Sequence, residues 1–403
     1  MYYCNHHHLN IRKPHYFKEK LSKGFLSLFY GKAITNVAVG LFSVFLPIFL
    51  YETFGESVRY VAFYYLAGFF LQLLLVFFLS PSLNKFGFRR AIRTSSFVGA
   101  LFYTAVFLLN KDNIWIIAPI MVFLIAFWRF LYWIPYNIDF AKFTNKKDRG
   151  KEVGVVEAVL SFLSVVTPIA AGFIIANSGF NTLFIFGIVI FGASAIPYIF
   201  LPRTKEKFSW SKYKIIKKIF SKENRQAAWL FFLDGMESSL PIFIWPIFLY
   251  ELLNGNYLEI GFLSTFVVAI TIILQVFAGK LADHKKEKVL KTGSFFYALG
   301  WLLKIFAFTA LHVFVIDAYH KFMRIFYRIP LDAFIFEKAS QQHHLVDEFS
   351  VFRQICLVSG RAVMTSLVIV LSFFVSLNWL FLLGVVASIV IGMVFNRFYC
   401  YLR

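Results

Sequence analysis

Pro47-Ile48-Phe49-Leu50-Tyr51-Glu52 closes the first long apolar run of this chain, and the same six residues return at Pro246–Glu251, where the seventh apolar run ends. A second pattern, Arg-x-x-Tyr-x-Ile-Pro, stands at Arg129–Pro135 in the fourth run and again at Arg324–Pro330 in the tenth. The two repeats are offset by 199 and 195 positions. Two matches at nearly one offset predict that a unit of six helices was duplicated in the same orientation.

The composition places those runs in a membrane. Of the 403 residues, 59% are hydrophobic and only 15% are charged, and the mean hydropathy is +0.70. A soluble domain is about half apolar and about a quarter charged, so a soluble fold of this size has too little interior for so much apolar surface. Lipid supplies the missing apolar environment.

Twelve stretches are long enough to cross the apolar core of a bilayer, which takes roughly 20 helical residues. We predict spans at 25–50, 58–79, 91–109, 114–136, 153–176, 182–201, 227–250, 259–279, 289–310, 312–335, 349–375 and 378–396. Backbone N–H and C=O groups must be paired within lipid, so each span is expected to be a helix. The predicted fold class is an all-α integral membrane protein with twelve transmembrane helices in two pseudo-symmetric six-helix bundles.

The distribution of charge predicts the orientation. The net charge of +20 would suggest nucleic acid as a partner if the protein were soluble. Most Lys and Arg residues here stand in the tails and the even-numbered loops, whereas the odd-numbered loops hold Arg59 and Lys111. The positive-inside rule then places both termini in the cytosol, with the protein in a plasma or inner membrane and no nucleic acid needed to explain the charge.

The longest predicted loop, 202–226, is rich in Lys and Arg and separates the two repeats. We expect it to lie as an amphipathic segment on the anionic inner leaflet of the bilayer. The predicted organisation is a cytosolic tail at 1–24, a six-helix bundle at 25–201, this basic linker, and a second bundle at 227–403.

The sequence offers no pattern typical of an enzyme. Its three cysteines, Cys4, Cys356 and Cys400, have no spacing that predicts a disulfide framework or a metal site. No Gly-rich phosphate loop, metal-binding motif or nucleophile motif stands in the loops. We therefore predict a non-enzymatic monomer with no cofactor and no resident metal.

The segment Gly279–Lys288, which follows the eighth span, reads Gly-Lys-Leu-Ala-Asp-His-Lys-Lys-Glu-Lys and resembles the G-x-L-A-D-R-x-G-R-K loop of the major facilitator superfamily. A matching loop follows the second span. The positions that align with the motif are Gly279, Asp283, Lys286 and Lys288 in the second half and Asn84, Lys85, Gly87 and Arg89 in the first. With the twelve spans and the duplication, this resemblance covers essentially the whole chain.

The resemblance implies a gate on the cytosolic side. In the family, the aspartate of this loop caps the positive end of a helix in the opposite half and helps to hold that side closed. Asp283 would supply the carboxylate here, and a carboxylate at a helix N-terminus contributes about 0.3–1 kcal/mol. Asn84 replaces the aspartate in the first half, so the uncharged latch there is expected to be weaker.

Ionisable residues inside the predicted spans are the candidates for function. Each charge exposed to lipid would cost about 2.5–3.5 kcal/mol, so such groups must face water or partners. The tenth span carries five of them on one helical stripe, namely Asp317, His320, Lys321, Arg324 and Arg328. The resemblance implies that the first, fourth, seventh and tenth helices line a central cavity, to which we also assign Asn36 and Arg129.

The seventh span carries Asp234 and Glu237, which are three residues apart and therefore share one helix face. Glu237 stands close to the middle of the span. A carboxylate held there beside an arginine is a candidate proton carrier, with Asp234 as its neighbour. An alternative interpretation of Glu237 is a fixed structural ion pair.

These residues predict a secondary active transporter that moves a small solute by alternating access, coupled to a proton or cation gradient. The predicted cavity is net basic, which favours anionic or polar cargo. Two alternatives use the same fold. Efflux of drugs or other amphiphiles is suggested by the many aromatic residues and by Thr167–Gly172, which is similar to an element of the family's antiporters. Lipid translocation is the other, with the polar stripe guiding a headgroup.

Overall fold

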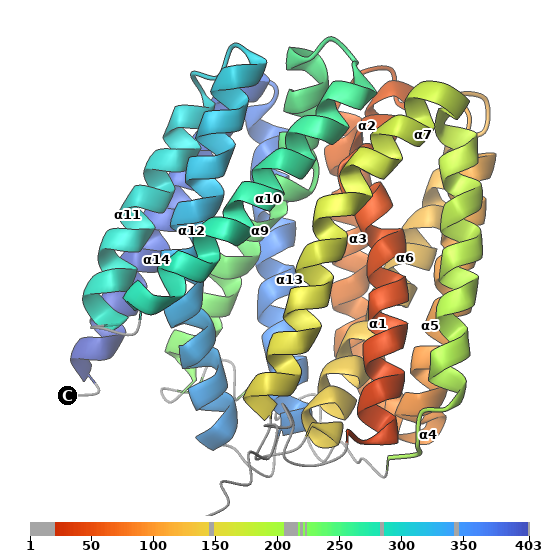
Figure 1. Ribbon diagram of the computed structural model, residues 1–403, viewed down its shortest axis with the longest axis vertical. Helices are drawn as coiled ribbons and strands as arrows, with labels where there is room; N and C mark the ends of the chain where they lie inside the picture. Colours follow the sequence, from red (N-terminus) through yellow and green to blue (C-terminus); the bar gives the residue numbers. More distant parts are fainter. Residues whose placement is uncertain are drawn as a thin grey trace, which may run out of the picture.

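The computed structural model describes residues 21–144, 149–204, 217, 221, 224–282, 286–341 and 346–401. Within these helices, the side chains of 149–150, 276–282, 286–291, 327, 329–341, 346–348 and 395–401 are outside the description as well. The described chain consists of helices, short turns and loops, and Figure 1 shows them as one bundle of long, roughly parallel rods.

The first half contains the helices up to residue 199. They are α1 Lys23–Phe42, α2 Phe45–Thr53, α3 Val58–Leu79, the short η1 Ser80–Ser82 and α4 Leu83–Phe86, α5 Phe88–Leu108, α6 Ile114–Phe143 and α7 Arg149–Ile199. Helix α7 is two spans in one, because Gly179 in its middle adopts a φ of 76° that turns the chain back. Only glycine takes such a φ without strain, which places the turn there.

The second half repeats this order. Its helices are α9 Arg225–Leu252, α10 Tyr257–Ala282, α11 Lys286–Lys304, α12 Ala310–Gln341, α13 Val346–Leu371, the short η2 Leu377–Leu380 and α14 Phe381–Tyr401. The fold class predicted from the sequence is confirmed: the arrangement is all-helical and fits twelve spans in two bundles. The exact bundle boundaries near 202 and 226 stay predictions, since most of the linker lies outside the described residues.

Length and hydropathy account for most of the spans. In the described part of the chain, nine stretches are long and apolar enough to cross a membrane, and the stretch Lys151–Ile199 holds two spans. Helices α11 and α12 are not among these nine, although they run beside the others in Figure 1. The charges of α12 lower its hydropathy, and these are the charges for which the sequence predicts a function.

Two predicted boundaries differ from the structure. The first span, predicted as one helix over 25–50, is interrupted at Ser43, whose hydroxyl donates to the Gly40 carbonyl oxygen at 2.9 Å. The ninth span, predicted to end at 310, ends earlier, because α11 already ends at Lys304 and α12 begins at Ala310. Thr309 then caps the start of α12 by accepting a hydrogen bond from the His312 amide at 3.2 Å.

The two halves meet closely where α7 crosses α10, and these helices lie side by side in Figure 1. A Cβ on Gly172 would stand 2.6 Å from the Tyr257 carbonyl oxygen, so the crossing requires a glycine there. Thr265 of α10 reaches into α7: its hydroxyl donates to the Val165 carbonyl oxygen at 2.8 Å and accepts from the Ile169 amide at 3.1 Å. Small residues let membrane helices approach this closely.

Candidate functional site

A cavity of about 430 Å³ lies between the two halves, near the middle of the helices. Its walls come from α1, α2, α3, α5, α6 and α7 of the first half and from α9, α12 and α13 of the second. Three of the lining residues are charged, and all three are arginines: Arg129, Arg324 and Arg361. No carboxylate lines the cavity within the described residues.

Two of the arginines share one aromatic ring. The guanidinium of Arg129 on α6 lies 5.4 Å from the centre of the Phe69 ring, and that of Arg361 on α13 lies 5.8 Å from the same ring. Arg361 also donates from Nε to the Ser238 hydroxyl oxygen at 3.3 Å. Cations over an aromatic face are held by about 0.5–2 kcal/mol, which positions the two guanidinium groups without neutralising them.

Arg324 on α12 completes the set. No hydrogen bond or ion pair joins Arg129, Arg324 or Arg361 to a carboxylate among the described side chains. Glu237 interacts electrostatically with Arg324 but accepts its hydrogen bond from elsewhere. The cavity therefore presents positive charge that its own walls do not pair.

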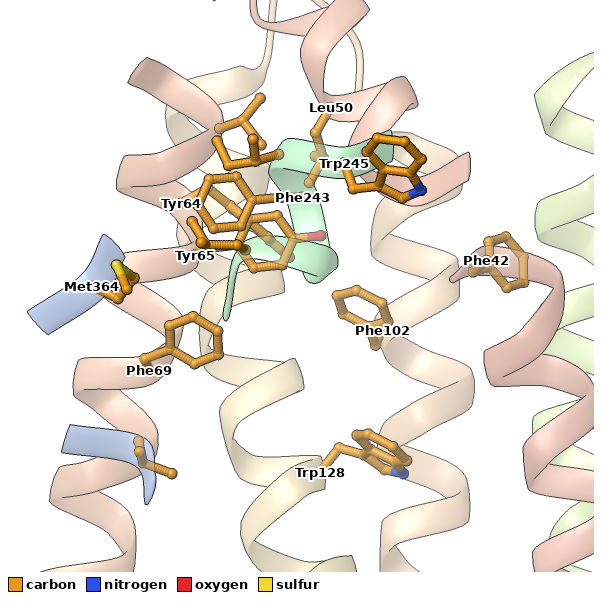
Figure 2. Packing of buried hydrophobic residues seen from close by; sticks show 14 of the residues in the cluster. Phe42, Leu50, Tyr64, Tyr65, Phe69, Phe102, Trp128, Phe243, Trp245 and Met364 are labelled. Carbon is orange, nitrogen blue, oxygen red and sulfur yellow. The ribbon is translucent and has the colours of Figure 1, made fainter. Parts of the chain in front are cut away.

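Aromatic side chains form much of the remaining wall. They are Phe42, Tyr64, Tyr65, Phe102, Tyr103, Trp128 and Phe191. Figure 2 shows Phe69, Phe102 and Trp128 on neighbouring helices of the first half, with Phe243 of α9 beside Tyr65. The Tyr65 and Phe243 rings stack at 5.0 Å between their centres, so an aromatic contact behind this wall joins the two halves.

Most of the predicted stripe on α12 turns toward partners in its own half. Asp317 is paired with Lys304 of α11, with Nζ and Oδ1 at 2.8 Å, and with Lys321 at 3.1 Å. The side chains of Lys304 and Asp317 are each only 3% exposed. Lys304 also lies over the Trp245 ring, 3.5 Å from its centre.

His320 and Glu237 belong to the same buried network. The His320 ring stacks on Tyr297 at 4.4 Å between ring centres, and its Nε2 has no hydrogen-bond partner among the described atoms. Tyr297 donates its hydroxyl proton to Glu237, which is 1% exposed. Glu237 thus lies between this network and Arg324 at the cavity wall.

The other predicted site residues are placed as follows. Arg328 Nη1 donates to Asp234 Oδ1 at 2.7 Å, which joins α12 to α9. Asn36 is half-buried on α1 and does not line the cavity. Of the α12 stripe, Arg324 alone is among the residues that line the cavity. The reason is geometric. The stripe covers more than three helical turns, so it passes α11, the cavity and α9 in succession. Asp317 at one end forms an ion pair with Lys304 of α11, and Arg328 at the other end forms one with Asp234 of α9.

The predicted gate residues are only partly described. Gly87 has a φ of 86° at the turn before α5, and Arg89 donates from Nη2 to the Ile199 carbonyl oxygen at 2.9 Å, at the C-terminal end of α7. Lys85 is exposed, and Asn84 takes part in an interaction with another residue. Gly279 lies in α10, whereas Asp283 and the side chains of Lys286 and Lys288 are outside the described part. The gate role stays a prediction.

The repeated hexapeptide makes a contact between the halves. Tyr51 donates to Glu251 Oε1 at 2.6 Å, so the tyrosine of the first copy meets the glutamate of the second. Glu52 of the first copy accepts a hydrogen bond from Tyr257 of α10. We call this end of the molecule, defined by Tyr51, Glu52, Glu251 and Tyr257, the closed end; it is the upper end in Figure 1.

Sequence reasoning did not assign the aromatic wall. Tyr64, Tyr65 and Trp128 stand in predicted apolar spans, where they could be taken for lipid-facing filler. Their polar atoms were the available signal, because a tyrosine hydroxyl or indole N–H within a membrane requires a partner. The sequence shows that such a partner is needed, and the cavity shows where these residues stand.

Comparisons with known proteins agree with this geometry. Residues 28–232, about half of the chain, match the family described as Major Facilitator Superfamily. A protein of Bacillus subtilis (strain 168) described as "Uncharacterized protein YqgE" is 22% identical over 358 residues, which cover 85% of this chain and 81% of that protein.

Solved structures of similar fold include two bacterial transporters. One is a bacterial homologue of the iron transporter ferroportin in an inward-facing state, with a TM-score of 0.66, 14% identity, and coverage of 94% of this chain and 99% of that one. The other is described as a bacterial metal transporter, with a TM-score of 0.63, 12% identity and the same coverage. At these identities the likeness shows a shared fold.

Proposed function

The chain belongs to the Major Facilitator Superfamily, and on that premise we propose that it is a secondary active transporter that carries a small organic anion across the membrane. The observation that carries the proposal is the set of Arg129, Arg324 and Arg361 around one cavity with no carboxylate in its described wall. Unpaired charges inside a membrane are costly, and an anionic ligand would supply the missing partner.

Alternating access is supported by the position of the cavity. It lies between the two repeats, where parallel-repeat transporters bind their cargo. The hydrogen bonds of Tyr51 and Tyr257 join the halves at the closed end. Breaking these contacts while the opposite ends approach would expose the cavity to the other side of the membrane.

Glu237 is proposed as the residue that couples transport to a proton. It is buried, it accepts a hydrogen bond from Tyr297, and it interacts electrostatically with Arg324 at the cavity wall. Binding of an anion to Arg324 would compete with this interaction, which gives a physical link between cargo and proton. Asp234 is proposed as its neighbour in the pathway, although Arg328 now holds it.

The setting in the cell is part of the same proposal. The protein would act as a monomer in a plasma or inner membrane, with both termini in the cytosol and the basic linker on the anionic inner leaflet. A reporter fused to each terminus and tested for accessibility in intact cells would establish the orientation.

A metal ion is the second candidate cargo, because both similar solved structures are described as metal transporters. The described side chains provide no group of three or more His, Cys, Asp or Glu able to hold a metal. Arginines at the cavity favour the anion over the cation. Amphiphile efflux and lipid translocation remain rivals that the same experiment separates.

The test is uptake by proteoliposomes, measured for radiolabelled organic anions, divalent metals, cationic drugs and lysolipids under an imposed pH gradient. We expect pH-driven uptake of an organic anion that is lost in Arg324→Ala. Glu237→Gln should abolish the pH-driven component while anion exchange across the membrane continues. Uptake of metals, drugs or lysolipids alone would overturn the proposal, and pH-driven uptake that survives Glu237→Gln would remove the proton role.

A further inference from the structure

We infer that the cargo of this cavity is an anion carried on a planar aromatic ring, that is, an aromatic acid. This inference rests on the proposed function and deepens it, since it names the class of anion. Three features carry it: the polar groups of the wall, the rings of the wall, and the size of the space.

Two polar groups of residues in the wall, one on Tyr64 and one on Trp128, lack partners. The Tyr64 hydroxyl and the Trp128 indole N–H are buried, with residues 7% exposed each, and neither has a hydrogen-bond partner among the described atoms. Unpaired buried donors in a native structure require an explanation, and a ligand that accepts hydrogen bonds is one. They add to the three guanidinium groups, which only donate.

The hydroxyl groups of the two lining serines are already engaged. Ser43 donates to the Gly40 carbonyl oxygen at 2.9 Å, and Ser238 donates to the Gly235 carbonyl oxygen at 3.2 Å while it accepts from Arg361. The three guanidinium groups and the Trp128 indole N–H of the described wall only donate, and the hydroxyl groups of Tyr64, Tyr65 and Tyr103 can donate or accept. A carboxylate, with two accepting oxygens and a negative charge, matches these groups best.

The rings form one continuous surface on the first half. Tyr103 stands 4.1 Å from Phe42 and 5.2 Å from Phe191, and Phe191 stands 5.6 Å from Trp128, all between ring centres. These four residues come from α1, α5, α7 and α6. Flat or edge-on packing against such rings favours a planar aromatic partner over a saturated one of the same size.

The size of the space limits the cargo. A volume of about 430 Å³ is at the lower end of the range for small-molecule sites, which is roughly 300–1,000 Å³. It fits an acid with one or two fused rings and is too small for a phospholipid with two acyl chains. Because guanidinium groups and rings line the same space, a carboxylate joined to a ring can contact both at once.

The test compares three molecules of one shape on the purified protein in detergent: 2-naphthoate, its fully saturated analogue decahydronaphthalene-2-carboxylate, and the neutral 2-naphthamide. Dissociation constants come from isothermal titration calorimetry. We expect 2-naphthoate to bind at least about tenfold more tightly than the saturated acid, and 2-naphthamide to show no binding.

Matched variants place the effect in the cavity. Trp128→Leu removes a ring of the wall and should bring the ratio between aromatic and saturated acid close to one. Trp115→Leu, on the same helix but 86% exposed on the outside, should leave the ratio unchanged. The comparison of the three ligands on the unaltered protein needs no variant, so it decides the inference even if Trp128→Leu fails to fold.

The outcomes separate the two proposals. Equal binding of aromatic and saturated acids, abolished by Arg324→Ala, would overturn the aromatic inference and leave anion transport standing. Binding of 2-naphthamide as tight as that of 2-naphthoate would overturn both. Binding of neither acid, with a metal ion or a lysolipid bound instead, would also overturn both.

Discussion

The two halves of this molecule are built from equivalent helices, but they use them differently. The carboxylates Asp234, Glu237 and Asp317 of the second half each contact a donor inside the membrane. At the repeat offsets of 199 and 195, the corresponding positions of the first half are Thr35, Ala38 and Val122. Lys304 and His320 likewise correspond to Ala105 and Ile125.

The arginine at 129 and 324 is the exception, because both halves keep it and both copies line the cavity. The first half surrounds its copy with aromatic rings, and the second half backs its copy with a paired network of charges. This contrast teaches that a duplicated scaffold can keep one residue at its shared cavity while the surroundings of that residue diverge. In the proposed mechanism the first half recognises the body of the cargo, and the second half carries the coupling.

The largest effect is expected at the most buried ion pair. Lys304→Ala leaves Asp317 charged and 3% exposed, with only Lys321 beside it, and should cost about 3–5 kcal/mol of unfolding free energy. The double variant Lys304→Ala/Asp317→Val introduces the residue types that the first half has at the equivalent positions, Ala105 and Val122. It should regain most of the lost unfolding free energy. Thermal unfolding in detergent, followed by circular dichroism, measures both. Equal stability of the single and the double variant would contradict the interpretation that the buried, unpaired charge of Asp317 causes the loss.

A smaller loss is expected at the second ion pair of the same half. Arg328 is 30% exposed, so its charge stays partly hydrated when Asp234 is neutralised. Asp234→Asn should cost about 1–3 kcal/mol in the same unfolding assay, less than Lys304→Ala. If Asp234→Asn cost more unfolding free energy than Lys304→Ala, the burial of the ion pairs would not determine the size of the loss.

The contact that joins the halves is expected to be weaker still. Tyr51→Phe removes the hydrogen bond to Glu251 at the closed end and should cost about 0.5–1.5 kcal/mol. Glu251→Gln should cost a similar amount, and the double variant should cost less than the sum, because both remove one interaction. Additive losses in this double-mutant cycle would show that the two side chains act independently.

The smallest effect on stability is expected at the shared arginine. Arg129 has no carboxylate partner among the described residues, so Arg129→Ala removes a half-buried, unpaired charge and a contact with Phe69 that contributes about 0.5–1 kcal/mol. These terms oppose each other, and the unfolding temperature without ligand should change little or rise. Arg328→Ala is the control, since it removes the ion-pair partner of the buried Asp234 carboxylate and should lower that temperature. A large drop in Arg129→Ala would show that Arg129 is structural.

Several features of the fold could be predicted from local properties of the sequence. The apolar runs predicted most of the spans, and the repeats at 47 and 246 and at 129 and 324 predicted two halves of six helices each. These predictions succeed because lipid demands helices and because a duplication leaves residues at a constant offset. The end of α11 at Lys304 was mispredicted, since no hydropathy change marks the short connection that follows.

The sequence by itself determined that this chain is a duplicated bundle of membrane helices with ionisable residues on its tenth span. Only the tertiary structure decided which of those residues could meet a ligand. Asp317 and Arg328 stand on the same stripe as Arg324. Lys304 of α11 and Asp234 of α9 form ion pairs with them, whereas no carboxylate among the described side chains forms an ion pair with Arg324. A charged side chain inside a membrane is stabilised by a nearby group of opposite charge, and here those groups come from other helices of the bundle, which the sequence alone does not place beside it.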